Sequence, residues 1–271
     1  MSETLIGLLH PGEMGAAVAA CLAGRGHQVL WLPAGRSPAT TARAAAAGLT
    51  AAAGPDAAGQ AADLARRAEV ILSICPPHAA LPVARAVLGD HAFTGIFVDA
   101  NAISPGTARE VAAVAESAGA RYVDGGIIGS PPGPAAGSRL YLSGPHAGAV
   151  AALFAGSTLQ ARVIEGRGLT AASAVKMAYA GWTKGRAALL LAVRALARAE
   201  GVEDTLLAEW ALSQPGLGQR SGGAARSAAA KGWRWTGEMT EISASMRANG
   251  LPGGFHSAAA EVFGHPDRFL D

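Results

Sequence analysis

Residues 4–15, TLIGLLHPGEMG, decide the fold of this chain. Residues 4–9 form an apolar run typical of a buried strand, and a tight turn then opens a helical segment at 14–26. A dinucleotide-binding turn has the pattern G-x-G-x-x-G, in which the glycines allow a tight turn, close approach of the pyrophosphate and close packing of helix on strand. Gly12 and Gly15 supply the second and third glycines, and His10 stands where the first would be. The stretch predicts a cofactor site; the alternative is an ordinary turn between strand and helix.

The rest of the first half repeats this alternation of strands and helices. Helices are expected at 39–48 and 104–119, the second with Ser104 as its N-cap and Pro105 in its first turn. Apolar runs predict further strands at 28–32, 68–75, 95–101, 121–127, 140–144 and 161–166. Such alternation is typical of a parallel, doubly wound sheet covered on both faces. We therefore predict an α/β, Rossmann-type domain over residues 1–167.

The second half of the chain, from residue 168, has no strand pattern. One long helical pattern covers 170–201, and shorter helices are expected at 203–213, 221–231, 237–249 and 255–263. A helix much longer than usual often packs against another chain or through a bundle. We predict that residues 168–271 form an all-helical domain that binds substrate and joins two copies of the chain in a homodimer.

The composition excludes several classes of protein. Half of the 271 residues are hydrophobic, 15% are charged and the formal net charge is +2, which excludes a disordered chain and predicts no nucleic-acid partner. No HExxH or CxxC spacing occurs, so no metal is expected. No apolar run is long enough for a membrane span, and no basic leader precedes one. With Cys21 and Cys75 expected to be reduced in apolar surroundings, we predict a cytoplasmic protein.

The cofactor is expected to be NADP (NADPH). An NAD site usually has a carboxylate about 20 residues after the glycines, on the ribose hydroxyl, but no Asp or Glu lies between Met14 and Pro55. Arg36 can fork onto a 2′-phosphate and Ser37 can add a hydroxyl; the alternative is a surface arginine. The loops at the strand ends supply the remaining candidates for cofactor binding: His10, Pro11, Gly12, Glu13, Met14, Cys75 and Pro76.

These features, in this order, resemble the β-hydroxyacid dehydrogenase and 6-phosphogluconate dehydrogenase superfamily, and more narrowly its subgroup with a C-terminal domain of unknown function. Imine reductases belong to the same broad superfamily. The resemblance rests on HPGEMG at 10–15, VDANAISP at 98–105, DGGIIGSPP at 124–132 and SAVKMAYAGWTKG at 173–185. It implies an NADPH-dependent oxidoreductase that moves a hydride between nicotinamide and a small carbonyl or hydroxy compound. The alternatives are an imine reductase and a non-catalytic, cofactor-binding dimer.

The resemblance also implies catalytic residues. In the family a K-x-x-N motif on the long helix carries the acid/base lysine; here Lys176 is kept and Tyr179 replaces the asparagine. The chain has only three lysines, so we expect Lys176 to be functional; the alternative is a half-buried interface lysine. Asn101 would lie beside the nicotinamide, unless it caps the next helix.

Substrate contacts are the least defined part of the site. The family motif similar to D-A-P-V-S-G-G falls on residues 124–130, where Ile128 replaces the serine that holds a carboxylate. We expect a partly apolar pocket between the two halves, with a set of polar and aromatic candidates: Gly129, Ser130, Lys184, Trp235 and Glu238. The alternatives are a solvated helix lysine at 184 and a dimer core around the tryptophan.

Overall fold

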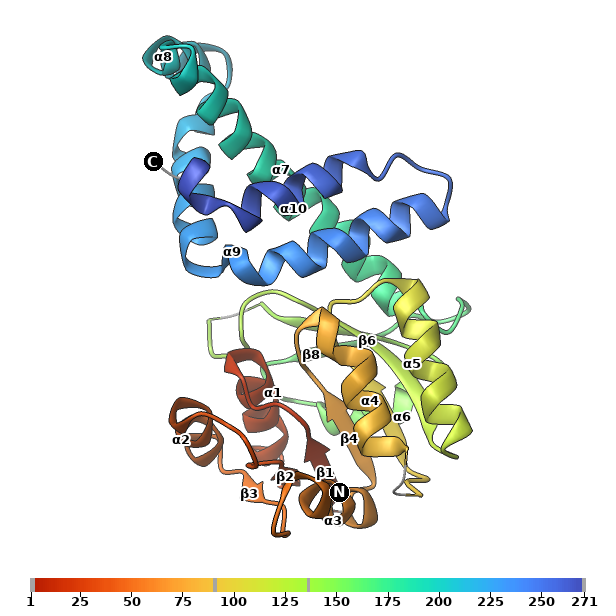
Figure 1. Ribbon diagram of the computed structural model, residues 1–271. Coiled ribbons are helices and arrows are strands. Elements are labelled where there is room, and N and C mark those ends of the chain that lie inside the picture. The colour runs from red at the N-terminus through yellow and green to blue at the C-terminus, as the bar shows by residue number, and fades with distance from the viewer. Residues whose placement is uncertain (1–2, 90–91, 136, 270–271) are drawn as a thin grey trace. The chain divides into compact units, whose positions relative to one another are not determined.

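The computed structural model describes residues 3–89, 92–135 and 137–269, and the chain divides into two compact units, Met1–Lys176 and Met177–Asp271 (Figure 1). The division falls inside helix α7 (Ala171–Ala199), nine residues after the boundary expected from the sequence. Lys176 is therefore the last residue of the first unit. The first unit is an α/β domain and the second is helical, as the sequence predicted.

The first unit is built on one eight-stranded sheet in the order β3-β2-β1-β4-β5-β6-β7-β8. Its strands are β1 (Leu5–Leu8), β2 (Gln28–Trp31), β3 (Thr50–Ala51), β4 (Val70–Ser73), β5 (Ile96–Asp99), β6 (Arg121–Ile128), β7 (Arg139–Ser143) and β8 (Gln160–Val163). Strands β1–β6 are mutually parallel, as expected, whereas β7 pairs antiparallel with β6, so β7 and β8 run opposite to the other strands. The reason is the connection at 129–138, since a parallel return needs a crossover of about a dozen residues or more.

The helices of the first unit follow the strands as the alternation requires. They are α1 (Glu13–Ala23), α2 (Pro38–Ala46), α3 (Ala57–Arg67), α4 (Ala80–Leu88), α5 (Pro105–Ser117) and α6 (Ala147–Leu153), with a 3₁₀ turn at Pro77–Ala79. Ser104 caps α5 by accepting a hydrogen bond from the amide of Thr107 at 3.1 Å, which confirms that prediction. Elements β3, α3, α4 and α6 were not predicted from the sequence. Strand β3 has only two residues and helix α6 only seven, too few for a clear periodic pattern, whereas α3 and α4 do have apolar residues at helical spacing.

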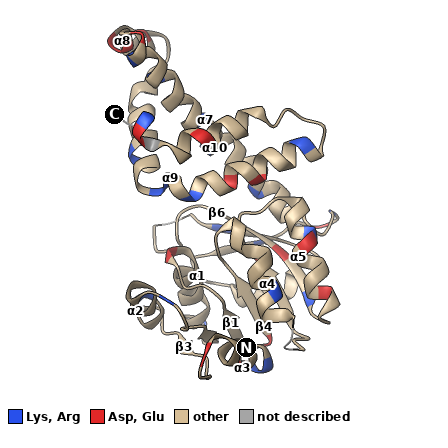
Figure 2. Cartoon of the chain, viewed as in Figure 1, with Lys and Arg blue, Asp and Glu red and all other residues tan. Residues whose placement is uncertain are grey.

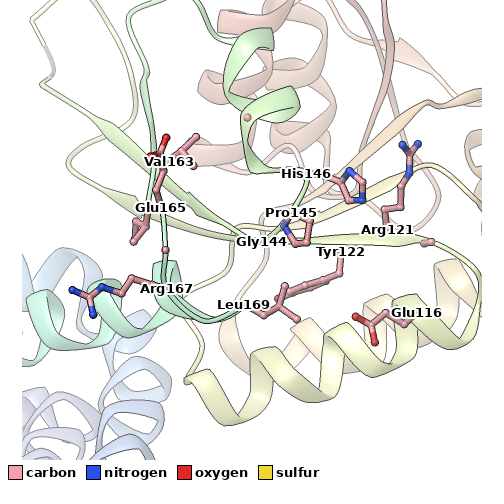
Figure 3. A pocket seen from close by; sticks show the side chains of 14 residues that line it. Glu116, Arg121, Tyr122, Gly144, Pro145, His146, Val163, Glu165, Arg167 and Leu169 are labelled. Carbon is pink, nitrogen blue, oxygen red and sulfur yellow. The ribbon is translucent and has the colours of Figure 1, made fainter.

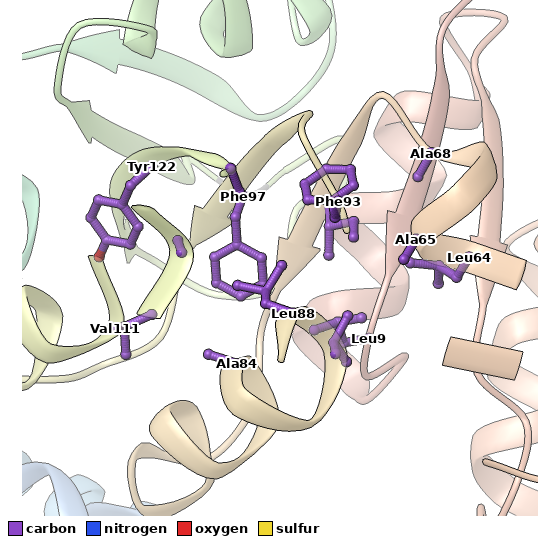
Figure 4. Close-up of a cluster of buried hydrophobic side chains, with 14 of the residues drawn as sticks. Leu9, Leu64, Ala65, Ala68, Ala84, Leu88, Phe93, Phe97, Val111 and Tyr122 are labelled. Atoms are coloured by element: carbon purple, nitrogen blue, oxygen red, sulfur yellow. The ribbon is translucent and has the colours of Figure 1, made fainter. Parts of the chain in front are cut away.

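Two apolar clusters pack on the two faces of this sheet. Successive strand residues point to opposite faces, so Phe97 lies in one cluster and Val98 in the other. Figure 4 shows the first cluster, in which Leu88 of α4 packs beside Phe97, with Tyr122 at one end. Because both faces are covered, the strand ends are the places where polar groups can gather.

The second unit contains the rest of α7 and the helices α8 (Glu203–Ser213), α9 (Leu217–Ala248) and α10 (Gly254–Gly264), with a 3₁₀ turn at Pro266–Arg268. The prediction of separate helices at 221–231 and 237–249 was wrong, because α9 continues through Gly232. Buried Ser243 of α9 donates to the carbonyl of Gly253, at the start of α10, at 2.9 Å. A glycine inside a helix costs only about 1 kcal/mol, which packing against α10 can offset.

Charged side chains of both signs are scattered over the ribbon rather than gathered (Figure 2). Across the described ranges, no helix is both long enough and apolar enough to cross a membrane. The same ranges hold no group of three metal-ligating side chains.

Candidate cofactor and catalytic site

The glycine turn after β1 has the geometry of a dinucleotide cradle. Gly12 is the N-cap of α1, with no side chain on the first helical amides, and a Cβ added to it would meet no atom within 4 Å. A Cβ at Gly15 would lie 2.1 Å from the carbonyl oxygen of His10, so only glycine fits there. Gly12 thus leaves room for a ligand at a helix N-terminus, where anions bind, and Gly15 lets helix and turn pack closely.

His10 occupies the position of the missing first glycine. Its Nδ1 is buried and has no hydrogen-bond partner, and the ring faces the charge of Arg36. Burial, with a smaller contribution from Arg36, lowers the pKa of His10 to about 4. The imidazole is therefore neutral near pH 7 and has one buried ring nitrogen to satisfy.

Arg36 lies against this turn. Its Nη2 donates to the carbonyl of Leu9 at 3.2 Å and its Nε to the carbonyl of Leu32 at 3.4 Å. Arg43 of α2 donates to the carbonyl of Pro11 at 3.4 Å, so a second guanidinium borders the same turn. Arg36 and Arg43 thus lie beside the turn, and no acidic residue occurs between positions 14 and 55. This excess of positive charge favours a ligand with an additional anionic group.

Ser37 has a structural role that was not predicted from the sequence. It is the N-cap of α2, and its Oγ accepts from the amide of Thr40 at 3.3 Å. The helix that carries Arg43 therefore begins at Ser37, directly beside Arg36.

Asn101 ties together the ends of β4 and β5. Its Oδ1 accepts from the amide of Cys75, its Nδ2 donates to Ser73 Oγ at 3.1 Å, and its own amide donates to Asp99 Oδ1 at 2.9 Å. The residue is buried, and so it fixes the segment at Cys75 and the exposed Pro76. Burial raises the pKa of the Cys75 thiol to about 12. Cys75 therefore stays a protonated, unreactive thiol at the ends of these strands.

Asp124 on β6 caps helix α7, a role that was not predicted from the sequence. Its Oδ2 accepts from the amide of Ser173 at 2.8 Å and its Oδ1 from the Ser173 hydroxyl at 2.5 Å. Ser143 of β7 completes the cap, because its Oγ accepts from the amide of Ala172 at 3.0 Å. Its single hydroxyl hydrogen is within reach of two acceptors, the Leu169 carbonyl at 2.9 Å and Asp124 Oδ2 at 3.1 Å. An acidic residue within a buried strand and a serine shortly before Lys176 are the signals that could have indicated this cap.

Asp124 and Asp99 face each other as a registered pair on neighbouring strands. Burial raises the pKa of Asp99 to about 7 and that of Asp124 to about 6. The negative charge of Asp124 raises the pKa of Asp99 further, against a hydrogen bond from the Asn101 amide that lowers it. At Asp124, hydrogen bonds from Ser173 oppose the effect of burial. Burial thus disfavours the ionised form of both carboxyl groups.

The two glycines that follow Asp124 bring neighbouring elements close. A Cβ at Gly125 would lie 3.0 Å from the carbonyl oxygen of Asp99 on β5. A Cβ at Gly126 would lie 2.8 Å from the carbonyl oxygen of Ala172 and 3.0 Å from the Cβ of Lys176, both on α7. Gly126 therefore lets the first turns of α7 lie directly on β6.

Lys176 reaches the carboxyl end of β6. Its Nζ donates to the carbonyl oxygen of Ile127 at 2.9 Å, and the side chain is half-buried. Strands β1, β4, β5 and β6 are parallel, so their carboxyl ends share one edge of the sheet. The lysine ammonium thus lies at the same edge as the glycine turn, Cys75 and Asn101.

The other substrate candidates are distributed over both units. Gly129 (φ +122°) and Ser130 are exposed directly after β6, and the Ser130 carbonyl accepts from Ser138 Oγ. Ile128 is buried, which agrees with an apolar floor. Tyr179 lies one turn after Lys176 on α7, and its side chain is 47% exposed.

Lys184, Glu238 and Trp235 form one cluster within the second unit. The Lys184 ammonium pairs with the carboxylate of Glu238 and lies 5.5 Å from the centre of the Trp235 ring. Trp235 packs edge-on against Phe263 with ring centres 5.0 Å apart. The three candidates are thus brought together, and this ion pair joins α7 to α9.

A hollow of about 880 Å³ opens elsewhere on the first unit, where β6 begins and β7 and β8 end (Figure 3). Two arginines, Arg121 and Arg167, and two glutamates, Glu116 and Glu165, lie among its lining residues. Figure 3 shows the ring of Tyr122 reaching toward Leu169 between them. This balance of charge does not select one class of ligand.

The family of the chain follows from a match over more than half of its length. Residues 4–154 match the model of the NAD binding domain of 6-phosphogluconate dehydrogenase. The chain belongs to that family. Residues 197–265 match a second model, a domain of unknown function. Family and fold together indicate an oxidoreductase that uses a nicotinamide cofactor, which confirms the resemblance seen in the sequence.

Solved structures with the same fold span several activities. A conserved protein of unknown function, described as similar to 3-hydroxyacid dehydrogenases, is 28% identical (TM-score 0.68) over 97% of both chains. The 3-hydroxyisobutyrate dehydrogenase of Mycobacterium tuberculosis, solved with L-serine, is 20% identical (TM-score 0.68) over 99% of this chain and 96% of that one. A variant imine reductase from Myxococcus stipitatus, solved with NAD⁺, is 20% identical (TM-score 0.58), with coverages of 100% and 96%. A search of the curated proteins found no match.

Proposed function

We propose that this protein is an NADPH-dependent oxidoreductase that interconverts a small carbonyl compound and the corresponding alcohol, with Lys176 as its acid/base. The observation that supports this most directly is the hydrogen bond from Lys176 to Ile127. It holds a proton-carrying side chain at the sheet edge that also carries the glycine turn. Ligands of open α/β sheets bind outside the carboxyl ends of the strands.

The preference for NADPH rests on Arg36 and Arg43. Gly12 and the uncapped start of α1 would receive the pyrophosphate, since the turn leaves open space there. Arg36 would fork onto the 2′-phosphate, with Arg43 as a second cation and the Ser37 region as the adjoining turn. His10 would direct its unpartnered ring nitrogen toward the bound cofactor.

In the reaction the bound nicotinamide supplies or accepts the hydride. Lys176 would give a proton to the substrate oxygen in the reducing direction and take it back in the other, and its charge would stabilise the developing alkoxide. Asn101 gives one Nδ2 hydrogen to Ser73, which leaves the other for the substrate oxygen or a carboxamide. Tyr179, on the next turn of α7, would orient the ammonium.

The runner-up functions keep the same fold. An imine reductase would bind a cationic iminium, which a protonated lysine repels, and this ranks it second. A non-catalytic dimer that only binds the cofactor is the remaining alternative, since His10, Ile128 and Tyr179 all depart from family motifs.

The proposal is tested by titrating the purified protein with NADPH and with NADH, read by energy transfer from its tryptophans. Tighter binding of NADPH, largely lost in Arg36→Ala, would support it, and a screen of ketones, hydroxy acids and cyclic imines would follow. Turnover of imines but of no carbonyl compound would move the proposal to an imine reductase. Binding of neither cofactor would overturn the proposal.

We also propose that two copies of the chain associate through α7. Three large apolar side chains lie seven residues apart on this helix and are mostly exposed: Trp182 (67%), Leu189 (64%) and Leu196 (62%). A spacing of seven residues places them along one stripe, the pattern of a helix seam. A second copy presenting the same stripe would cover them in a symmetric dimer.

A further inference from the structure

The anchoring of α7 to β6 involves more than packing. At the N-terminus of the helix, Asp124 and Ser143 together receive the amides of Ala172 and Ser173, two of the amides that a helix leaves without internal partners. A carboxylate at this end is also favoured by the helix dipole. Helix α7 therefore begins at a fixed point on the sheet.

The other two contacts also involve the first two turns of α7. Gly126 lets Ala172 and Lys176 approach the strand, and the carbonyl of Ile127 receives the lysine ammonium. Four consecutive residues of β6, 124–127, thus contact a neighbouring element. Gly125 packs against β5, and the other three contact α7. A shift of the helix start relative to Asp124 would move the Lys176 backbone by the same amount.

We propose that Asp124 is a positioning residue for Lys176: with Ser173 and Ser143 it sets the place of α7 on β6 and so the place of the lysine ammonium at the carboxyl end of the sheet. Asp124 touches neither cofactor nor substrate in this role. The catalytic meaning of the proposal rests on the proposed function of Lys176, whereas the positioning itself does not.

The scarcity of lysine makes this positioning directly observable. The chain has three lysines, Lys176, Lys184 and Lys231, so reductive methylation with ¹³C-formaldehyde gives three lysine signals besides that of the amino terminus. A dimethylated ammonium keeps one N–H and can still donate to Ile127. Single Lys→Arg variants assign the signals, and the exposed Lys231 supplies the reference for an unheld side chain.

The experiment compares Asp124→Asn and Ser173→Ala with Ser104→Ala, all full-length and folded. Ser104 is the matched control because its hydroxyl caps α5 and not α7. We expect the Lys176 signal of both anchor variants to move toward the Lys231 signal, while Ser104→Ala leaves it in place. Asp124→Glu, which keeps the charge, should restore part of the wild-type shift.

Turnover and cofactor binding complete the test. A misplacement of a catalytic group by about 1 Å lowers kcat by about 100-fold, so Asp124→Asn should lose kcat on that scale while its NADPH Kd stays at the wild-type value. If Asp124→Asn does not fold, Ser173→Ala, which keeps the carboxylate and one of its two contacts with residue 173, carries the comparison.

An unchanged Lys176 signal in a folded anchor variant would overturn the proposal, as would an equal change in Ser104→Ala. If the signal moves but Lys176→Met retains full turnover, the positioning stands and the proposed acid/base function fails. The two failures are therefore distinguishable.

Discussion

The Nζ of Lys176 donates a hydrogen bond to the carbonyl oxygen of Ile127 at 2.9 Å. A backbone carbonyl accepts this hydrogen bond but is itself uncharged, so it does not neutralise the ammonium. The lysine is therefore held in place without a carboxylate partner at that contact. An ammonium held in this way keeps further N–H groups for a substrate oxygen.

Replacing Lys176 with Met should remove proton transfer while leaving the cofactor site intact. Loss of a positioned acid/base group lowers kcat by about 10²–10⁴-fold. The measurement is steady-state turnover alongside an NADPH titration, with the exposed Lys231→Met as the matched control. Wild-type turnover in Lys176→Met would remove this residue from the mechanism.

Replacing Arg36 with Ala should weaken NADPH binding more than NADH binding. Hydrogen bonds to a charged group contribute about 1.5–3 kcal/mol, which corresponds to roughly 10–100-fold in Kd. Paired fluorescence titrations measure both constants, and Arg109→Ala, on the exposed side of α5, is the control. Equal losses for the two cofactors would show that Arg36 does not recognise the 2′-phosphate.

Two glycine substitutions should separate binding from stability. Alanine at Gly12 meets no protein atom and has an ordinary φ of −67°, so Gly12→Ala should fold with an unchanged Tm yet bind the cofactor at least about tenfold more weakly. Alanine at Gly126 meets α7, so Gly126→Ala should lose about 1–3 kcal/mol of stability. Thermal melts and NADPH titrations of both variants check this. A Gly12→Ala protein with full affinity would show that the cofactor does not bind against Gly12.

The buried Asp99 should make stability depend on pH. Its folded pKa of about 7 lies above its ordinary value of 3.8, so the folded state binds the proton more tightly than the unfolded state. The stabilisation is complete below about pH 4 and is lost as the pH rises to about 7. Asp124 contributes in the same direction, and His10, whose pKa is lowered to about 4, contributes in the opposite one.

Asp99→Asn isolates this contribution, because the amide oxygen can still accept from the backbone of Asn101 while the ionisation is gone. Between about pH 5 and about pH 8, Tm should fall more in the wild type than in the variant. Denaturation midpoints across this range give the comparison. Parallel curves would mean that Asp99 titrates alike in the folded and unfolded states.

Replacing Leu189 with Glu should dissociate the proposed dimer. A carboxylate in the middle of an apolar helix seam must be desolvated on association, which opposes it. Light scattering after size-exclusion chromatography should show a dimer for the wild type and for Leu212→Glu, and a monomer for Leu189→Glu. Leu212 is the control because it is 81% exposed on α8. A monomeric wild type would remove the dimer proposal.

The architecture could be predicted from the sequence because its signals are local. The glycine turn at 10–15, the Ser104 cap and the long pattern that became α7 each depend on residues close together in the chain. The reversal of β7 and the continuity of α9 could not be predicted in the same way, because each depends on what the segment packs against.

The site was predictable only in part, for the same reason. Arg36 and Lys176 were found from residue type and motif, and the structure brings Arg36 to the glycine turn and Lys176 to the same edge of the sheet. The task of Asp124 was not found, because its partner Ser173 lies 49 residues further along the chain. Likewise Asn101 was expected to face the ligand, and only the structure shows its two bonds to the end of β4.

The tight contact between Gly15 and the carbonyl of His10 constrains how this sequence can drift. A glycine codon becomes an alanine codon by one base change, and the chain has accumulated many alanines. Where space is open, as at Gly12, such a change is removed only if it harms ligand binding. At Gly15 the added methyl group would lie 2.1 Å from a backbone oxygen, so any descendant that keeps this turn must keep glycine there, whatever reaction it comes to catalyse.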